Sequence, residues 1–315
     1  HHPITIMASE ETASSTASSH YNSNDYYEPS ATTSTNNHYE GFWEPHTSSV
    51  DFCESNYLQT PYVVEFHNTW SSLLGISFFG LVGLLAANPT HEWRYTMAYS
   101  ILLLVGIGSA GLHGSLHWIF QSSDELPMIY LASCLNYMAL EYDAPHGKPH
   151  YPWLAKALGV LAVVNTLVYY RFQEIYLVFL ITYTSSVLLL VSLMYRILFQ
   201  TNQQTKTRGP VAKTIGIMGM VSYLLVGSPV WILDMLQCHN VVVPIADELP
   251  GWWKGFTPHV IWHFAAGFGT YCTIVTLCCC RMEELKIPFH VKFVGGILPI
   301  LLKDNQPNDE KKKLR

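Results

Sequence analysis

Three histidines interrupt segments that are otherwise apolar: His113, His259 and His263. His259 and His263 lie four residues apart in TPHVIWHFAAGFGTY, so both side chains project from one face of a helix. Three neutral imidazoles with an open fourth position form the ligand set of a catalytic zinc ion. The alternative for each histidine is a hydrogen bond inside a helix bundle. His117 follows His113 by four residues, and we interpret it as an interfacial residue rather than a ligand.

Two other side chains near His113 in the sequence suit acid–base or electrostatic chemistry. Ser109 precedes His113 by four residues, and its hydroxyl can donate to a substrate carbonyl oxygen that gains negative charge. The alternative is a serine that bonds back to its own helix. Asp124, in SSDELPM, can exchange protons with a metal-activated water or, alternatively, cap the start of a helix. Ionisable groups at membrane depth are costly, so the set predicts a membrane-embedded metallohydrolase.

The composition indicates an integral membrane protein with one core domain. Only 13% of the residues are charged, against about 25% in soluble domains. Residues 1–40 are rich in Ser, Thr and Asn and are predicted to be disordered. The core domain is expected over 41–301, followed by a charged tail over 302–315. No basic flank precedes an apolar stretch near the N-terminus, so we expect the first span to act as the targeting signal.

The apolar stretches approach the roughly 20 residues that a bilayer requires. They predict an all-α bundle of seven transmembrane helices, with Pro, Gly and charged residues between the spans. The expected spans are 66–87, 95–118, 125–142, 153–170, 174–199, 211–235 and 258–280.

The basic residues predict the orientation of these spans. Residues 1–65 contain no Lys or Arg, and 15 of the 17 basic residues fall on one side, the exceptions being Arg171 and Lys254. By the positive-inside rule the N-terminus is lumenal and the C-terminus cytosolic. The three histidines and Asp124 then lie in the lumenal half of the bundle.

A second cluster of polar residues precedes the first span, in DFCESNY and VVEFHN. Asp51, Glu54, Asn56 and Glu65 supply four hard oxygen side chains within fifteen residues, which favours calcium. The spacing is not that of an EF-hand. The alternative is an acidic linker that is only solvated.

Two of the seven cysteines, Cys53 and Cys238, are both expected in the lumen, where disulfides are permitted, so they are candidates for a pair. At the other end of the chain, KKKLR matches a cytosolic dilysine retrieval signal through Lys312 and Lys313. That signal predicts residence in the endoplasmic reticulum or Golgi membrane and contact with a coat protein. The alternative is a basic tail attracted to anionic lipid.

Several segments, taken in order, resemble the alkaline ceramidases, seven-span lipid amidases related to the adiponectin-receptor group. They are GFWEPHTSSVDFCESNY, YVVEFHNT, GSAGLHGSLHW, DELPMIY, WILD and HVIWHFAAGFGTY, and the resemblance covers about 41–301. It implies that His113, His259 and His263 bind zinc and that Ser109 and Asp124 lie beside the metal.

The resemblance also implies that calcium is held by the four acidic and amide side chains named above and by the backbone carbonyl of Phe52. Phe52 stands where relatives have a tryptophan, a change that a backbone ligand tolerates. The implied reaction is hydrolysis of the amide of ceramide, including phytoceramide or dihydroceramide, to a sphingoid base and a fatty acid. Other classes remain as alternatives: a seven-span receptor with a structural metal, and a transporter, for which no inverted repeat is visible.

Overall fold

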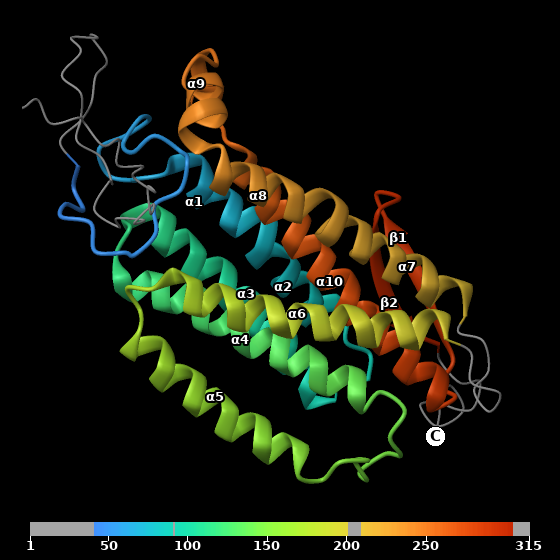
Figure 1. Cartoon of the computed structure of the whole chain (residues 1–315). Helices are drawn as coiled ribbons and strands as arrows, with labels where there is room; N and C mark the ends of the chain where they lie inside the picture. The colour runs from blue at the N-terminus through green and yellow to red at the C-terminus, as the bar shows by residue number, and fades with distance from the viewer. Residues whose placement is uncertain (1–40, 91, 201–208, 305–315) are drawn as a thin grey trace, which may run out of the picture. The chain divides into compact units, whose positions relative to one another are not determined.

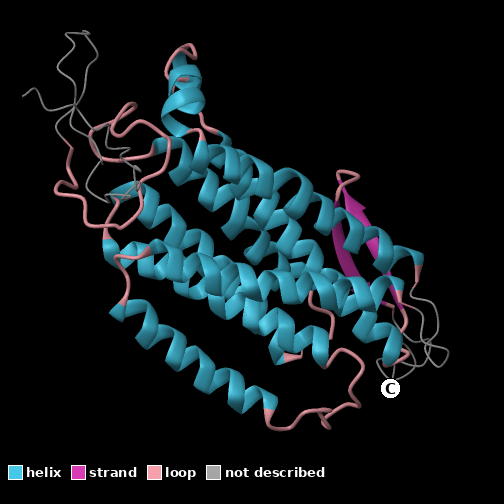
Figure 2. Ribbon diagram, in the orientation of Figure 1, coloured by secondary structure: helices cyan, strands magenta, loops and turns pink. Residues whose placement is uncertain are grey.

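The computed structural model describes residues 41–90, 92–200 and 209–304. The segment expected to be disordered, residues 1–40, lies outside the described residues, as do Lys312 and Lys313 of the basic tail. The described chain is mainly helical, as the composition predicts, and it adds one small sheet (Figure 2).

The first helical stretch consists of α1 (Phe66–Ser72), the π-helical turn η1 (Leu73–Ser77) and α2 (Phe78–Ala86). The next helices are α3 (Trp93–Ser115), α4 (Trp118–Leu140), α5 (Leu154–Arg171) and α6 (Tyr176–Phe199). A second interrupted stretch consists of α7 (Pro210–Met220), the π-helical turn η2 (Val221–Gly227) and α8 (Ser228–Leu236). After the short elements η3 (Cys238–Val242), α9 (Val243–Ala246) and η4 (Gly251–Trp253) comes α10 (Pro258–Glu284).

Six of these helical stretches are long and apolar enough to cross a membrane: 66–86, α3, α5, α6, 210–236 and α10. The predicted third span corresponds to α4, which has 23 residues but is not among the six. Its first turns carry Gln121, Asp124 and Glu125, all of them buried in the bundle. These polar side chains lower the mean hydropathy of α4. They are buried because they face other helices and the site described below.

The core is built around α10, which packs on α1, η1, α7, η2 and α8, while α3 packs along α4 (Figure 1). Three tyrosines, Tyr95, Tyr99 and Tyr271, are completely buried in it. The peripheral helix α5 makes its contacts chiefly with α4.

Glycines bring the helices of the site close together. A Cβ atom on Gly267 of α10 would lie 1.8 Å from the carbonyl oxygen of Gly75 in η1. A Cβ on Gly108 of α3 would lie 2.1 Å from the carbonyl oxygen of Ser123 in α4. Side chains at either position would push these backbones apart. The site therefore depends on glycine at both crossings.

Ion pairs join the opposite ends of the same helices. One carboxylate oxygen of Glu92 lies 2.7 Å from Arg94, and the other lies 2.9 Å from Arg281 at the end of α10. Arg94 also donates to the carbonyl oxygen of Glu141, which follows α4. The two guanidinium groups thus tie α3, α4 and α10 together, far along the helices from the histidines.

A hairpin follows α10, formed by β1 (Phe289–Val294) and β2 (Leu298–Lys303) paired antiparallel. Its inner residues Ile300 and Leu301 are buried, and Tyr271 donates a hydrogen bond of 2.7 Å to the carbonyl oxygen of Pro299. The sequence analysis expects no strand here, so the fold is not wholly α-helical.

Candidate active site and metal centre

The three predicted histidines come together at one end of the bundle. His113 belongs to the last turn of α3, and His259 and His263 to the first two turns of α10. One ligand nitrogen from each lies within 4.8 Å of the others, and each residue is about 1% exposed. Among the described residues, this is the one cluster of at least three potential ligands that close together.

Each imidazole has its Nδ1 atom directed at an oxygen-bearing side chain. Nδ1 of His113 lies 2.5 Å from Oε2 of Glu65, and Nδ1 of His263 lies 2.7 Å from the hydroxyl oxygen of Ser71. Nδ1 of His259 lies 3.7 Å from a carboxylate oxygen of Asp234. The hydrogen-bonded partners of His113 and His263 fix the orientation of those two rings and leave the other nitrogen of each for a metal, as is usual at histidine metal sites.

The donor set therefore fits a zinc ion. Three neutral imidazoles can each offer Nε2, and an open fourth position is left for water or substrate. The buried Asp234 carboxylate, which has no hydrogen-bond partner among the described residues, also fits a site that gains positive charge. Neither Ser71 nor Asp234 is predicted from the sequence as a site residue. Asp234 appears there only within WILD, one of the segments that resemble the family. An acid within an apolar span was the signal for Asp234, whereas Ser71 gives no such signal.

Ser109 and Asp124 line the same cavity as His259 and His263. Ser109 is one turn before His113 in α3, and its hydroxyl oxygen lies 3.1 Å from that of Ser72. Asp124 is about 9% exposed and lies within hydrogen-bonding reach of Ser109. The close approach of α3 and α4 at Gly108 places the two side chains next to each other.

The helix boundaries differ from those predicted in this region. Leu116 ends α3 in a left-handed conformation with φ 47°, and α4 begins at Trp118, seven residues before the predicted start. Asp124 is therefore inside α4 and does not cap it. His117 takes the cap position instead and accepts a hydrogen bond of 3.4 Å from the backbone N–H of Ile119. The described structure leaves His117 out of the histidine cluster.

The four predicted calcium side chains gather around the start of α1. Glu54 accepts hydrogen bonds from the backbone N–H groups of His67 and Asn68 at 2.6 and 2.7 Å, so it caps this helix from outside. The Glu65 carboxylate accepts from the backbone N–H of Phe52 at 3.0 Å. Asn56 donates to Asp51 at 3.3 Å, and its own buried carbonyl oxygen has no hydrogen-bond partner.

Two of these carboxylates are buried together without a Lys or Arg partner among the described ion pairs. Glu54 is 2% exposed and Glu65 is fully buried. Burial raises the pKa of Glu65 to about 7, and burial followed by repulsion from Glu65 raises the pKa of Glu54 well above its usual value. A hard divalent cation would relieve both effects and bind the unpartnered oxygen of Asn56, so the residues fit calcium.

Phe52 has a position that the sequence did not indicate. Its ring centroid lies 4.8 Å from that of His113 and 4.3 Å from that of His259. The side chain thus covers the histidine cluster, while its backbone belongs to the acidic segment. Sequence analysis considered only the backbone carbonyl of this residue.

The acidic segment is also joined to the loop between α8 and α10. Cys53 and Cys238 form a disulfide, with their Cα atoms 5.3 Å apart. Ser55 donates to the carboxylate of Asp247 at 2.8–2.9 Å, and the Gln59 side chain donates to the carbonyl oxygen of Lys254 at 2.8 Å. These contacts hold the segment over the end of the bundle that contains the histidines.

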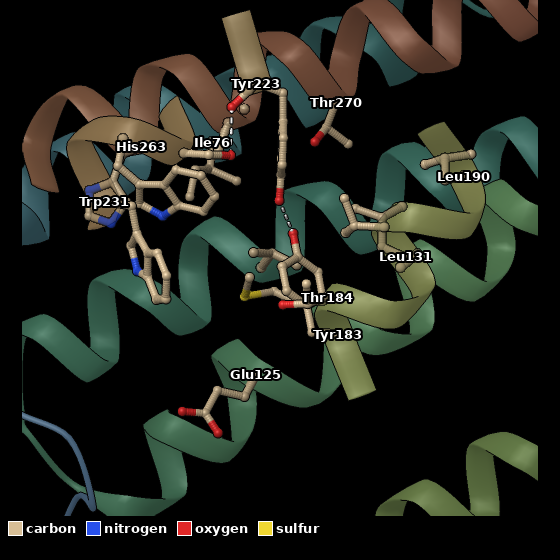
Figure 3. A pocket seen from close by; sticks show the side chains of 18 of the residues that line it. Ile76, Glu125, Leu131, Tyr183, Thr184, Leu190, Tyr223, Trp231, His263 and Thr270 are labelled. Carbon is tan, nitrogen blue, oxygen red and sulfur yellow. Dashed lines mark hydrogen bonds between the residues drawn. The ribbon is translucent and has the colours of Figure 1, made fainter. Parts of the chain in front are cut away.

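The site opens into a cavity of about 320 Å³, and Figure 3 shows some of the side chains that line it. His259, His263, Ser109 and Asp124 lie at its polar end, next to Glu125. The rest is mainly apolar, with walls from α3, α4, α6, η2, α8 and α10. A mainly apolar lining beside a few polar groups suits a ligand that carries both hydrocarbon and a polar group.

Comparisons with known proteins agree with this architecture. A family model described as Ceramidase matches residues 44–295. An alkaline ceramidase of Arabidopsis thaliana is 30% identical over 261 residues, which cover 82% of this chain and 93% of the relative. Alkaline ceramidase 3 of Mus musculus is 29% identical over 283 residues, which cover 85% of this chain and 96% of the relative. A Saccharomyces cerevisiae alkaline ceramidase is 26% identical over 274 residues, covering 81% and 83%. Because the family model matches residues 44–295 and these relatives align over more than four-fifths of the chain, the chain belongs to the ceramidase family of membrane-embedded hydrolases.

Proposed function

We propose that this chain hydrolyses the amide bond of ceramide with a zinc ion held by His113, His259 and His263. The observation that carries this proposal is the meeting of a three-histidine cluster with Ser109 and Asp124 at the polar end of an apolar cavity. The products are a sphingoid base and a free fatty acid. Phytoceramide and dihydroceramide are included among the substrates.

The bound zinc supplies Lewis acidity, which polarises a carbonyl group and makes water a stronger nucleophile near neutral pH. Asp124 accepts the proton of the attacking water and returns it to the leaving amine. Ser109 donates a hydrogen bond to the carbonyl oxygen as negative charge develops there. Glu65 and Ser71 hold the rings of His113 and His263 in orientation from behind, and the Asp234 carboxylate faces Nδ1 of His259 at 3.7 Å.

The substrate reaches the site from the bilayer. Leu188 of α6 and Ile232 of α8 line the cavity and are 61% and 46% exposed. A cavity wall that is also part of the lipid-facing surface is the expected feature of a lateral opening. Both chains of ceramide can then enter between α6 and α8 without crossing water.

A calcium ion bound by Asp51, Glu54, Asn56, Glu65 and the carbonyl of Phe52 supports activity. Glu65 and Phe52 also contact the histidine cluster. A cation that fixes the acidic segment therefore also fixes the positions of the zinc ligands. The disulfide between Cys53 and Cys238 acts in the same way by holding this segment over the site.

The chain crosses the membrane seven times, with α4 as the third span and the N-terminus in the lumen. The distribution of basic residues supports this orientation. We place the protein in the endoplasmic reticulum or Golgi membrane, with Lys312 and Lys313 as the contact for a coat protein. The site then faces the lumenal half of the bilayer.

The test is an amidase assay on purified protein in lipid nanodiscs, with ceramide as the substrate and mass spectrometry of both products. We expect equal amounts of sphingoid base and fatty acid, loss of turnover after zinc chelation, and recovery when zinc is restored. Turnover that persists in metal-free protein would exclude the zinc mechanism. Absence of both products from zinc-loaded protein would exclude the substrate.

A further inference from the structure

One carboxylate of the cavity has no role in the chemistry described above. Glu125 follows Asp124 in α4, lines the cavity and is only 3% exposed (Figure 3). An ionised carboxylate is costly to bury unless hydrogen bonds and a positive charge compensate it. Glu125 therefore requires an explanation of its own.

Neighbouring side chains hold this carboxylate in place without using all of its hydrogen-bonding capacity. Gln121, one turn earlier in α4, donates to Oε1 of Glu125 at 3.0 Å. The Gln121 side chain is itself fixed by Ser49, whose backbone N–H donates to its amide oxygen at 2.8 Å. Tyr169 lies near the carboxylate, yet its buried hydroxyl makes no hydrogen bond among the described residues. Because a carboxylate can accept about four hydrogen bonds, Glu125 can still bind a donor from a ligand.

The chain supplies no lysine or arginine to balance the charge of Glu125. None of the described Lys or Arg side chains lines the cavity. Arg94 and Arg281 form their ion pairs at the other ends of α3 and α10, and the histidines are neutral as zinc ligands. Asp124, the neighbour of Glu125, is a second acid close enough to interact with it electrostatically. A ligand group with a positive charge therefore fits beside these two carboxylates.

The proposed reaction produces one such cation. Hydrolysis breaks the bond between the carbonyl carbon and the nitrogen, and the nitrogen takes a proton from Asp124 and leaves as an amine. A further proton from water converts this aliphatic amine into an ammonium group, the form that predominates near neutral pH, as it does for lysine. The other product, the fatty acid, is an anion that the same two carboxylates repel. The polar end of the cavity thus distinguishes the two products by their charge.

We propose that Glu125 binds the ammonium group of the sphingoid base after the amide is cleaved and thereby slows the release of this product. The inference rests on the proposed ceramide hydrolysis and extends it to product release. Glu125 suits this role because it adjoins Asp124, which protonates the leaving nitrogen, and both side chains line one cavity. Since the amide of ceramide is uncharged, the ion pair forms only after cleavage. It stabilises the product complex and not the substrate complex.

The test compares two inhibitors of ceramide hydrolysis by the zinc-loaded protein in nanodiscs. They are dihydrosphingosine and octadecane-1,3-diol, which has the same chain and both hydroxyls but no amine. We expect the wild type to bind dihydrosphingosine at least about tenfold more tightly than the diol, the scale of a hydrogen bond between charged groups. Glu125→Gln should bring the ratio of the two inhibition constants close to unity, because the amide keeps the size of the side chain and removes its charge. Inhibition by added fatty acid should not weaken in this variant.

Glu248→Gln is the matched control, because Glu248 is an exposed acid in the loop before α10 and does not line the cavity. It should keep the ratio of the wild type, which separates binding at Glu125 from an effect of the amine on the charge of the bilayer. A wild type that binds both inhibitors equally would overturn the inference. Glu125→Gln protein that keeps the full ratio would overturn it as well.

A second measurement does not depend on turnover. Displacement of a fluorescent sphingoid base from zinc-loaded protein gives the same ratio even if Glu125→Gln is inactive, and bound zinc equal to that of the wild type shows that the variant folds. An equal loss of affinity for both inhibitors would assign Glu125 a packing role and also overturn the inference. If the wild type bound dihydrosphingosine through Glu125 but hydrolysed no ceramide, the proposed function would fail on its own.

Discussion

Glu65 connects the acidic segment to the histidine cluster, because its Oε2 lies 2.5 Å from Nδ1 of His113 while its Oε1 accepts the backbone N–H of Phe52. The residue is fully buried and stands immediately before α1. It is therefore a candidate ligand of one metal and the orienting partner of a ligand of the other. This double role makes its substitution informative.

We expect Glu65→Gln to weaken zinc binding by about 10–100-fold, the usual cost of losing such an orienting partner. Activity should fall at limiting zinc and recover in part when zinc is in excess, because the amide keeps the size of the side chain. Titration of the purified variant with zinc, read as bound metal and as turnover, checks both effects. Wild-type zinc affinity in this variant would contradict an orienting role for Glu65.

His113→Ala, His259→Ala and His263→Ala should each abolish zinc retention and turnover, since two imidazoles cannot complete the site. His117→Ala is the control, because its side chain interacts with the start of α4 and lies outside the cluster. Elemental analysis of each purified variant measures the bound metal directly. Stoichiometric zinc in the His259→Ala protein would refute the ligand assignment.

The sequence predicts those features of the site that depend on residues close together in the chain, and not those that depend on contacts between distant segments. The i, i+4 spacing of His259 and His263 fixed their common face, and His113 was recognised because an imidazole is rare in an apolar helix. The position of Asp124 within α4 was not predictable, because it depends on the left-handed turn at Leu116, and SSDELP resembles a helix start. Ser71 was missed because a serine in a span usually bonds to its own helix.

The same difference between local and long-range features applies to the fold. The apolar stretches predict seven spans, and six of them match a membrane-length helix within a few residues, since length and hydropathy are local properties. The seventh, α4, is less apolar than these six because it carries Gln121, Asp124 and Glu125. The hairpin of β1 and β2 was not predicted, since its stability depends on contacts with a distant helix: Leu301 packs in the same core cluster as Tyr271, which also donates to the Pro299 carbonyl.

Asp124→Asn should retain zinc and lose turnover by at least about 10²-fold, the range of a lost acid–base group. Ser109→Ala should cost a similar factor or less, because it removes one donor to the carbonyl oxygen. Both variants keep the shape of the site, so bound zinc should match the wild type. The measurement is kcat for ceramide alongside metal content, and full activity in either variant would assign that residue to a structural role.

Calcium removal should lower activity while zinc remains bound. The acidic segment then has Glu54 and Glu65 buried together without a cation, and Phe52 is held less firmly over the histidines. A calcium-selective chelator, with zinc measured before and after, tests this expectation. Asn56→Ala should reproduce a weaker form of the effect, since it removes the unpartnered oxygen alone. Activity that is unchanged in both cases would restore the solvated-linker interpretation.

The disulfide between Cys53 and Cys238 spans a sequence separation of 185 residues. Chain-entropy models give up to about 5 kcal/mol for a loop of this size, and less when the helices between the cysteines stay in the bilayer. The Cys53→Ser, Cys238→Ser double variant should therefore unfold at a lower temperature than the wild type.

The effect on catalysis should exceed the effect on stability if the disulfide positions the acidic segment. Cys53 adjoins Phe52 and Glu54, so its release loosens both the ring over the histidines and the cap on α1. We expect weaker calcium activation in the double variant at temperatures where it is fully folded. Cys134→Ser, at a free buried cysteine in α4, is the control for removing a thiol elsewhere. Melting curves and calcium titrations that coincide with the wild type would show that Ser55 and Gln59 hold the segment without the disulfide.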